Sequence, residues 1–323
     1  MTTNNQVKEV IYMKKIFGVD LGGTTVKMGL FDENGEVIEK WEIITRKEEG
    51  GKLILPDIAG SIKSKMAEKS IAKEDVIGVG IGVPGPVDGK GVVYKCVNLG
   101  WGVFSVKDTL SELLDGIRVE AGNDANVAAL GEMWKGGGQG HSNMVAVTLG
   151  TGVGGGIIID GKILTGCTGA GGEIGHIHVR DGETDSCGCG NKGCLEQYAS
   201  ATGVNRLTRR RLAKDNKPSS LRGKDINAKV VWDAVKEGDE LAIEVAEEFG
   251  EYLGKGLASV AGVVNPEVFV IGGGVSKAGD ILIKYMKPHY ESNVFHGSRD
   301  CKFALATLGN DAGIFGAAKL VVE

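Results

Sequence analysis

A histidine and three cysteines with the spacing of metal ligands lie in one glycine-rich stretch of this sequence. Cysteine thiolates and a histidine imidazole are the ligands of closed, tetrahedral zinc sites, and the glycines between them permit the tight backbone that lets the ligands converge. Two alternatives are that His178 supplies the nitrogen ligand, or that three unrelated cysteines share a loop. The predicted zinc ligands are His176, Cys187, Cys189 and Cys194.

Two glutamates, Glu173 and Glu196, bracket these ligands along the chain. A zinc ion with four protein ligands is structural, because no coordination position is left open for chemistry. The neighbouring carboxylates keep free acceptor oxygens for a polar ligand. We therefore interpret the stretch as a metal staple that holds a polar pocket in shape.

Glycine accounts for 53 of the 323 residues, more than twice its usual share of about 7%. The glycines gather after apolar runs, where backbone N–H groups can approach a phosphate because no side chain intervenes. Three such turns, at 21–25, 150–152 and 272–274, suit a nucleoside triphosphate. The Gly-x-Gly-x-x-Gly spacing at 150–155 does not indicate a dinucleotide site, because a strand rather than a helix follows it.

Two aspartates have positions suited to phosphoryl transfer. Asp20 ends the first apolar run, where a carboxylate can hold Mg²⁺ through water or simply cap the turn. Asp124 follows Asn123 at the start of a predicted helix, where helix capping is the plain interpretation. The other interpretation of Asp124 is a general base that takes the proton from an attacking hydroxyl. The residues alone leave both interpretations open.

The alternation of strands and helices predicts an α/β protein in two lobes. Residues 19–24 and 147–152 share a strand that runs into a glycine turn, which indicates a duplicated fold unless the likeness is chance. The expected strands span 16–20, 26–31, 36–44, 76–83, 117–120, 144–149, 155–160, 162–164, 268–271 and 302–306. The expected helices span 53–69, 106–114, 123–134, 241–264, 281–286 and 313–322.

Composition argues against several classes of protein. A net charge of −5 makes nucleic acid a poor partner, and the sequence has no run of about 18 apolar residues that would predict a membrane span. The polar start of the chain lacks signal-peptide character, so we expect reduced cysteines and a cytoplasmic protein. The basic stretch from Arg206 to Lys217 is interpreted as a solvated helix and loop, with a phosphate or partner contact as the alternative.

Seven motifs follow one another in order from about residue 14 to the end of the chain. They are Asp-Leu-Gly-Gly-Thr-Thr at 20–25, Val-Pro-Gly-Pro-Val-Asp at 83–88, Gly-Asn-Asp-Ala-Asn at 122–126, Leu-Gly-Thr-Gly-Val-Gly-Gly-Gly at 149–156, Glu-Ile-Gly-His at 173–176, Cys-Gly-Cys-Gly-x-x-Gly-Cys-Leu-Glu at 187–196 and Ile-Gly-Gly-Gly at 271–274. In these motifs the sequence resembles the ROK family of sugar kinases, most of all the bacterial ATP-dependent glucokinases. The zinc motif is highly specific.

The resemblance implies an actin-like, hexokinase-type (ribonuclease H-like) duplicated α/β fold, with ATP and a sugar in the central cleft between two lobes. The small lobe would comprise residues 14–122 and 312–323, and the large lobe residues 123–311 with the zinc loop. Residues 1–13 would be a disordered lead-in. A homodimer or a dimer of dimers is also expected.

The resemblance further implies that the γ-phosphate of ATP is transferred to the 6-hydroxyl of glucose, with Mg²⁺, structural zinc and Asp124 as the general base. Expected contacts to the sugar are Gly85, Asn98, Asn123, Asp124, Glu173, His176 and Glu196. Expected contacts to the nucleotide and its Mg²⁺ are Asp20, Gly22, Gly23, Thr24, Thr25, Lys27, Thr148, Gly150, Thr151, Gly152, Gly272, Gly273 and Gly274.

One departure from the family's pattern lies in the first turn. Many members carry lysine directly after Gly-Gly-Thr, where this chain has Thr25. Lys27 is then the candidate for the positive charge near the phosphates, and its alternative is a surface lysine on a hairpin strand.

The sequence leaves the sugar open to another hexose, such as N-acetylmannosamine, fructose or allose, and leaves polyphosphate open as the donor. A sugar-responsive regulator of the same family is disfavoured, because only about fifteen polar residues precede the first strand, too few for a DNA-binding helix-turn-helix.

Overall fold

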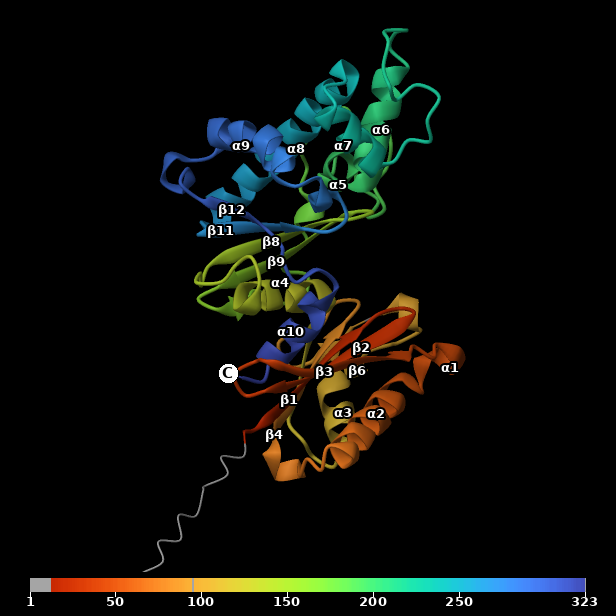
Figure 1. Cartoon of the computed structure of the whole chain (residues 1–323), viewed down its shortest axis with the longest axis vertical. Coiled ribbons are helices and arrows are strands. Elements are labelled where there is room, and N and C mark those ends of the chain that lie inside the picture. Colours follow the sequence, from red (N-terminus) through yellow and green to blue (C-terminus); the bar gives the residue numbers. More distant parts are fainter. Residues whose placement is uncertain (1–12, 95, 323) are drawn as a thin grey trace, which may run out of the picture.

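The computed structural model describes residues 13–94 and 96–322, which form two mixed β-sheets with helices on and between them (Figure 1). The first sheet has the strand order β3-β2-β1-β4-β7. Its strands are β1 (Lys15–Leu21), β2 (Thr25–Asp32), β3 (Val37–Ile44), β4 (Val76–Val83) and β7 (Val119–Asn123). Of the predicted lead-in over residues 1–13, only Met13 lies among the described residues.

The second sheet repeats this plan, with the order β10-β9-β8-β11-β12. In each sheet the first three strands along the chain form an antiparallel meander, the fourth pairs in parallel with the first, and the fifth pairs in parallel with the fourth. The repetition of topology confirms the predicted duplicated α/β fold. The strands are β8 (Met144–Leu149), β9 (Val153–Ile159), β10 (Lys162–Ile163), β11 (Val268–Gly272) and β12 (Lys302–Leu305).

Helices cover both sheets and fill the space between them. Helices α2 and α3 lie against the first sheet, and α5 to α9 gather over the second (Figure 1). The helices are α1 (Glu48–Gly51), α2 (Ile54–Glu68), α3 (Val106–Leu113), α4 (Asp124–Lys135), α5 (Glu196–Ala199), α6 (Ala201–Leu212), α7 (Ala228–Lys236), α8 (Glu240–Val264), α9 (Asp280–Asn293) and α10 (Ala312–Lys319). A small hairpin joins β5 (Val92–Val93) to β6 (Phe104–Ser105).

Helix α8 shows how the sequence sets these boundaries. Asp239 caps its start by accepting a hydrogen bond from the Ala242 N–H, which satisfies one of the free donors of the first turn. Asn265 ends it in the left-handed conformation at a φ of 43°, and Pro266 cannot continue a helix. The apolar face predicted at 241–264 is buried in the core of the second lobe.

Two helices, α4 and α10, lie between the sheets and cross at very short distance (Figure 1). A Cβ atom on Gly316 of α10 would lie 1.6 Å from the Val127 carbonyl oxygen of α4, and one on Gly131 of α4 would lie 2.2 Å from the Ala312 oxygen. On its other side α10 packs equally closely on the first sheet, where Gly80 faces the Ala317 backbone. Isolated glycines therefore bring four layers of backbone into contact, a role that the sequence analysis did not assign to them.

Two expectations about elements need correction. Helix α9 runs through Pro288 and is more than twice as long as expected, and its backbone packs closely on Gly250 and Gly254 of α8. Helices α1, α5 and α7 were not predicted. The basic stretch is not a solvated helix and loop throughout, because Arg211 on α6 is buried and pairs with Glu244.

Replacement of Gly316 by alanine tests the helix crossing. The added Cβ would strike backbone rather than a flexible side chain, so we expect Gly316→Ala to lower the free energy of unfolding by at least 1–3 kcal/mol, the usual cost of overpacking. Gly262→Ala is the matched control, because that helical glycine has open space around it, and it should raise stability by roughly 0.5–1 kcal/mol. Urea unfolding measures both, and equal effects would contradict the close crossing.

Candidate functional site

Asn123 and Asp124 lie where β7 ends and α4 begins. The Asn123 side-chain oxygen accepts the N–H groups of Ala125 at 3.1 Å and Asn126 at 3.2 Å, so it is Asn123 that caps the helix. Its amide nitrogen donates to the Gly85 carbonyl at 3.0 Å and to the Asp124 carboxylate at 3.1 Å. The Asp124 carboxylate also accepts the Ala125 N–H, at 2.8 Å, so both residues support the start of the helix, and Gly85 and Asn123 are in direct contact.

The Asp124 carboxyl is held in a setting that raises its pKa. Burial is the main cause, and the charge of Glu173 adds to it, while hydrogen bonds from Ala125 and Asn123 act in the opposite direction. A carboxylate whose pKa is raised toward neutrality takes up a proton more readily than an exposed one, which is what a general base requires.

Asp20, at the end of β1, faces the same space. Burial and, second, the charge of Asp124 raise the pKa of Asp20 to about 6, and Lys27 opposes the rise. The start of α10 lies directly over this carboxylate, since a Cβ on Gly313 would lie 2.5 Å from the Asp20 Cγ. Two partly buried carboxylates close to each other form a favourable place for a divalent cation.

The first glycine turn is fastened by a residue that sequence reasoning missed. The Thr45 hydroxyl, just after β3, donates to the Gly22 carbonyl at 2.7 Å, and its N–H donates to the Thr24 carbonyl at 2.9 Å. Within the turn, the Gly22 N–H donates to the Thr25 carbonyl at 3.0 Å. Lys27 follows on β2, and its Nζ donates to the Asn310 carbonyl at 3.1 Å. Lys27 therefore connects the first turn to the loop before α10.

Several residues of the expected nucleotide site line a cavity of about 510 Å³. It is lined by Thr148 and the third glycine turn, together with Asn310 and the start of α10. Gly273 has a φ of +84°, and a side chain there would strike the Leu149 backbone at 2.5 Å. The third turn is thus pressed against the end of β8, where the second turn begins. Residues of the cavity that were not predicted include Glu132, Ser276, Lys277 and Asn310.

Glu132 holds one wall of this cavity in place. It is buried, and its carboxylate accepts the backbone N–H groups of Gly137, Thr307 and Leu308 at 2.9, 3.0 and 2.9 Å. These partners come from two segments far apart in the sequence, so no local pattern could have marked Glu132 before the fold was known.

The predicted zinc ligands converge, with their four ligand atoms all within 4.8 Å of one another. The His176 Nδ1 lies 3.6 Å from the Cys187 Sγ, and the sulfurs of Cys189 and Cys194 are 3.7 Å apart. His178 is not part of the cluster, because its ring contacts Asp181 at 3.0 Å and the Lys192 carbonyl at 3.0 Å. Three thiols and an imidazole gathered in this way match the donor set of structural zinc.

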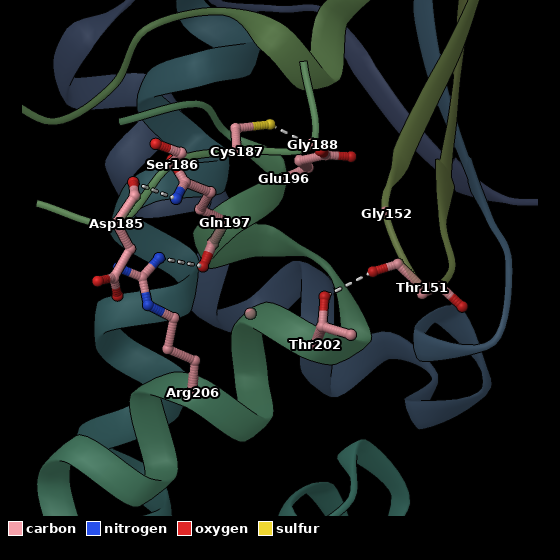
Figure 2. Close-up of a pocket in the computed structure, with 11 residues that line it drawn as sticks. Thr151, Gly152, Asp185, Ser186, Cys187, Gly188, Glu196, Gln197, Thr202 and Arg206 are labelled. Carbon is pink, nitrogen blue, oxygen red and sulfur yellow. Dashed lines mark hydrogen bonds and ion pairs between the residues drawn. The ribbon is translucent and has the colours of Figure 1, made fainter. Parts of the chain in front are cut away.

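Glu196, the first residue of α5, connects this cluster to the second glycine turn (Figure 2). Its Oε1 accepts from the Cys187 Sγ at 2.9 Å and lies 3.8 Å from the His176 Nδ1. Its Oε2 accepts the Val153 N–H at 3.4 Å, and a side chain on Gly152 would come within 2.4 Å of it. An expected sugar contact and an expected phosphate turn therefore touch directly.

The remaining expected sugar contacts surround this centre. Glu173 is exposed, and its carboxylate lies 3.9 Å from the His176 Nε2. Asn98 lies exposed in the short helix Val97–Leu99. The pKa of Cys96, just before this helix, is raised by burial and further by the charge of Asp124, which places this loop near Asp124.

A second cavity, of about 400 Å³, lies beside Glu196, between the second glycine turn and α6 (Figure 2). Thr202, near the start of α6, donates to the Thr151 carbonyl at 2.7 Å. Gly150 closes the turn by donating to the Gly152 carbonyl at 3.0 Å. Thus Gly150, Thr151 and Gly152 lie together at the end of β8, whereas Thr148 faces the other cavity.

No helix among the described residues is both long and apolar enough to cross a membrane.

Comparison with known proteins agrees with this geometry. Residues 16–323 match the model of the ROK family. A glucokinase of Halalkalibacterium halodurans is 45% identical over 312 residues, which cover 95% of this chain and 94% of that protein. The ROK family glucokinase of Streptomyces griseus, solved in complex with glucose and AMPPNP, is 35% identical with a TM-score of 0.69, covering 95% and 98% of the two chains. A ROK hexokinase from Thermus thermophilus is 31% identical with a TM-score of 0.78, covering 95% and 97%.

The raised pKa of Asp20 predicts a pH dependence of stability. The folded chain binds this proton more tightly than the unfolded chain, whose pKa is near 3.8. The stabilising contribution is therefore complete below about pH 4 and is lost as the pH rises through about 6. Between pH 4 and 7 the free energy of unfolding of the unmodified protein should fall, relative to that of Asp20→Asn, by roughly 2–3 kcal/mol in Mg²⁺-free buffer.

Asp88 provides a control of opposite sign, because the Val92 N–H chiefly lowers its pKa. Its contribution is lost as the pH falls, so the unmodified protein should lose stability relative to Asp88→Asn on acidification. A difference between the unmodified protein and Asp20→Asn that does not change with pH would show that Asp20 is not buried beside Asp124.

Proposed function

This chain belongs to the ROK family, and we propose that it is an ATP-dependent glucose kinase that produces glucose 6-phosphate and ADP. The glucokinase relatives cover the chain almost from end to end. The observation that carries the proposal is the partly buried Asp124 carboxylate. It lies close enough to Asp20 and Glu173 for electrostatic interaction with both carboxylates. This arrangement supplies a base, a cation site and a sugar-binding rim around one point.

In the proposed reaction, Asp124 takes the proton from the 6-hydroxyl of the sugar. The resulting oxygen attacks the γ-phosphorus of ATP, the bond from that phosphorus to the β,γ-bridging oxygen breaks, and ADP leaves. Asn123 supports the base, because its amide donates a hydrogen bond to the carboxylate and thereby fixes its orientation. Gly85 is held in the same group of contacts through its carbonyl.

The sugar's other hydroxyls would contact Asn98, Glu173, His176 and Glu196. A sugar offers only hydroxyl groups, so its site requires acceptor carboxylates and a donor or acceptor of fixed direction. The proximity of His176 and Glu196, whose nearest atoms are 3.8 Å apart, supports this assignment.

ATP would bind along the three glycine turns, with its adenosine in the cavity beside Gly272–Gly274 and its phosphates toward Asp20. The backbone N–H groups of these turns suit phosphate oxygens. Lys27 donates to the Asn310 carbonyl at the rim of that cavity. Its charge also opposes the rise in the pKa of Asp20, so we assign to Lys27 the positive charge near the phosphates. Mg²⁺ bound near Asp20 would neutralise charge on the phosphates.

Zinc would be held by His176, Cys187, Cys189 and Cys194. When bound, the metal supplies rigidity and no reactive group, because four protein ligands leave it closed. It would fix the tautomer and the angle of the His176 ring, and it would keep Cys187 from donating a proton to Glu196.

A coupled ADP-release assay across a panel of hexoses tests the proposed activity. With ATP and Mg²⁺ we expect the highest kcat/KM for glucose, and lower values for fructose, allose and N-acetylmannosamine. Preference for one of the other hexoses would overturn the sugar assignment. Absence of ADP release with every sugar would overturn the kinase proposal itself.

The role of Asp124 is tested by Asp124→Asn, which keeps the size and removes the base. We expect kcat to fall by about 10²–10⁴-fold, while glucose still binds. Asp108→Asn is the matched control, since Asp108 also lies in the first turn of a helix but is exposed and away from the cleft. If both variants keep the kcat of the unmodified protein, Asp124 is not the general base and only stabilises the start of the helix.

A further inference from the structure

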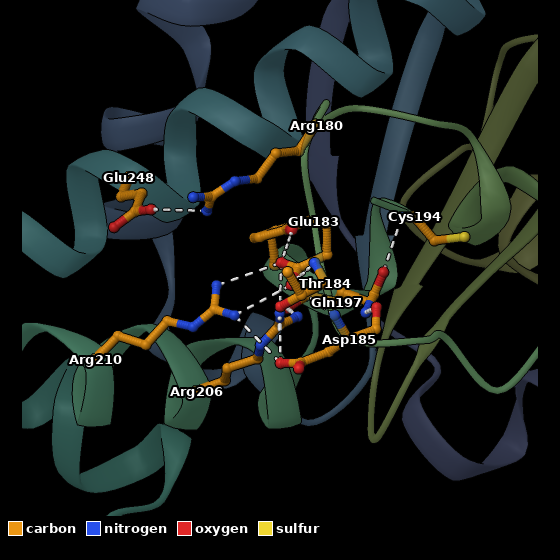
Figure 3. A network of polar contacts seen from close by, with 10 residues as sticks. Arg180, Glu183, Thr184, Asp185, Cys194, Gln197, Arg206, Arg210 and Glu248 are labelled. Carbon is orange, nitrogen blue, oxygen red and sulfur yellow. Dashed lines mark hydrogen bonds and ion pairs between the residues drawn. The ribbon is translucent and has the colours of Figure 1, made fainter. Parts of the chain in front are cut away.

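The zinc loop, residues 176–194, is also attached to the rest of the lobe through side chains other than the four metal ligands (Figure 3). Its outermost part carries Glu183, whose side chain is only 2% exposed. The Glu183 carboxylate accepts the backbone N–H groups of Thr184 and Asp185 at 2.9 and 3.0 Å. These bonds fold the tip of the loop around the carboxylate.

Two arginines of α6 pair with the same carboxylate. Arg210 donates to Glu183 at 3.2 and 3.3 Å, and Arg206 forms an ion pair with it. Both arginines also contact the Asp185 carboxylate, at 3.2 and 3.0 Å. The network holds two carboxylates and two guanidinium groups, so its charges balance. Balance of this kind is needed when a carboxylate is removed from water.

The network reaches α5 through two further residues. The Tyr198 hydroxyl donates to Glu183, and the guanidinium groups of Arg180 and Arg206 lie 5.5 and 5.4 Å from the centre of the Tyr198 ring. Gln197 accepts the Cys194 N–H at 3.1 Å and donates to the Asp185 carbonyl at 3.0 Å. Glu196 directly precedes these two residues on the four-residue helix α5.

The ionised state of Glu183 is secured by its partners. Burial by itself would raise its pKa, but hydrogen bonds from Tyr198, the Asp185 N–H and Arg210, with the charge of Arg206, hold the pKa of Glu183 well below its usual range. The Glu183 carboxylate therefore stays ionised and accepts hydrogen bonds from these partners. A short helix such as α5 has little stability of its own, so its position depends on contacts of this kind.

We propose that Glu183 is a positioning residue of the sugar site: by tying the zinc loop to α5 and α6, it sets where Glu196 stands against the sugar. This inference rests on the proposed function, in which Glu196 contacts the sugar. Zinc would gather the two ends of the loop, His176 on one side and Cys187 to Cys194 on the other, and Glu183 fixes the part between them. The two attachments are independent, because the metal ligands do not hold this middle part or the side chains of α5 that contact it.

The variants Glu183→Gln and Tyr198→Phe test the proposal. Each weakens the network, and the second removes a single oxygen. We expect the KM for glucose to rise about tenfold through displacement of Glu196, while the KM for ATP stays within about twofold and zinc content stays unchanged. The double variant should be little worse than Glu183→Gln alone, because both changes break one connection.

Two controls separate this role from a general loss of stability. Glu244→Gln breaks another ion pair of α6, with Arg211 at 3.2 Å, and Tyr290→Phe removes a buried tyrosine hydroxyl that donates to the Ser298 carbonyl. Neither residue contacts α5 or the zinc loop, so both variants should keep the glucose KM of the unmodified protein. If Glu183→Gln fails to fold, Tyr198→Phe and its control decide the question.

Hydrogen exchange of the amides of residues 194–200 provides a readout that needs no glucose. We expect faster exchange there in Glu183→Gln and Tyr198→Phe than in either control. Unchanged exchange and unchanged glucose KM would overturn the proposal, as would an equal rise in the KM of glucose and ATP. An unmodified protein that shows no activity on glucose would instead overturn the proposed function, and the exchange comparison would still decide whether Glu183 holds α5.

Discussion

The close crossing of α4 and α10 is the constraint on which the site depends. At Gly131 and Gly316 the two helix backbones touch with no side chain between them. Asp124 opens α4, and the start of α10 covers Asp20 through Gly313. The crossing therefore fixes two carboxylates near one point, although they come from different strands of the first sheet. Burial raises both pKa values, aided by the charge of Asp124 acting on Asp20 and by the charge of Glu173 acting on Asp124.

The second lobe completes the site through a different kind of contact. Glu196 touches the second glycine turn on one side and the Cys187 sulfur on the other. The second glycine turn is also fastened independently, by the Thr202 hydroxyl on α6, which donates to the Thr151 carbonyl at 2.7 Å, so a change in the zinc loop acts mainly on Glu196. Because α5 is short, its place is set by the metal ligands before it and by the ion-pair network around Glu183. Rigid support of this kind is what a binding site built from loops requires.

The sequence predicted those parts of the molecule that depend on local pattern. The apolar runs at 76–83 and 144–149 gave strands with the observed bounds, and the clustered spacing of the cysteines, with His176, predicted a set of side chains that the structure brings together. Parts that depend on the meeting of distant segments were missed. Glu132 and Thr45 act on backbone groups far away in the chain, and Gly131 and Gly316 stand as single glycines in ordinary helical stretches. The arginines of α6 were predicted to be solvated because their partners, Glu183 and Glu244, lie at least 23 and 33 positions away in the sequence.

A crystal structure of the protein with glucose and a non-hydrolysable ATP analogue tests the account most directly. The account predicts that the 6-hydroxyl of glucose lies within hydrogen-bonding distance of the Asp124 carboxylate. It also predicts that other hydroxyls contact His176 and Glu196, with the γ-phosphate on the side of Asp20. A sugar bound with another hydroxyl at Asp124, or bound without contact to Glu196, would contradict it.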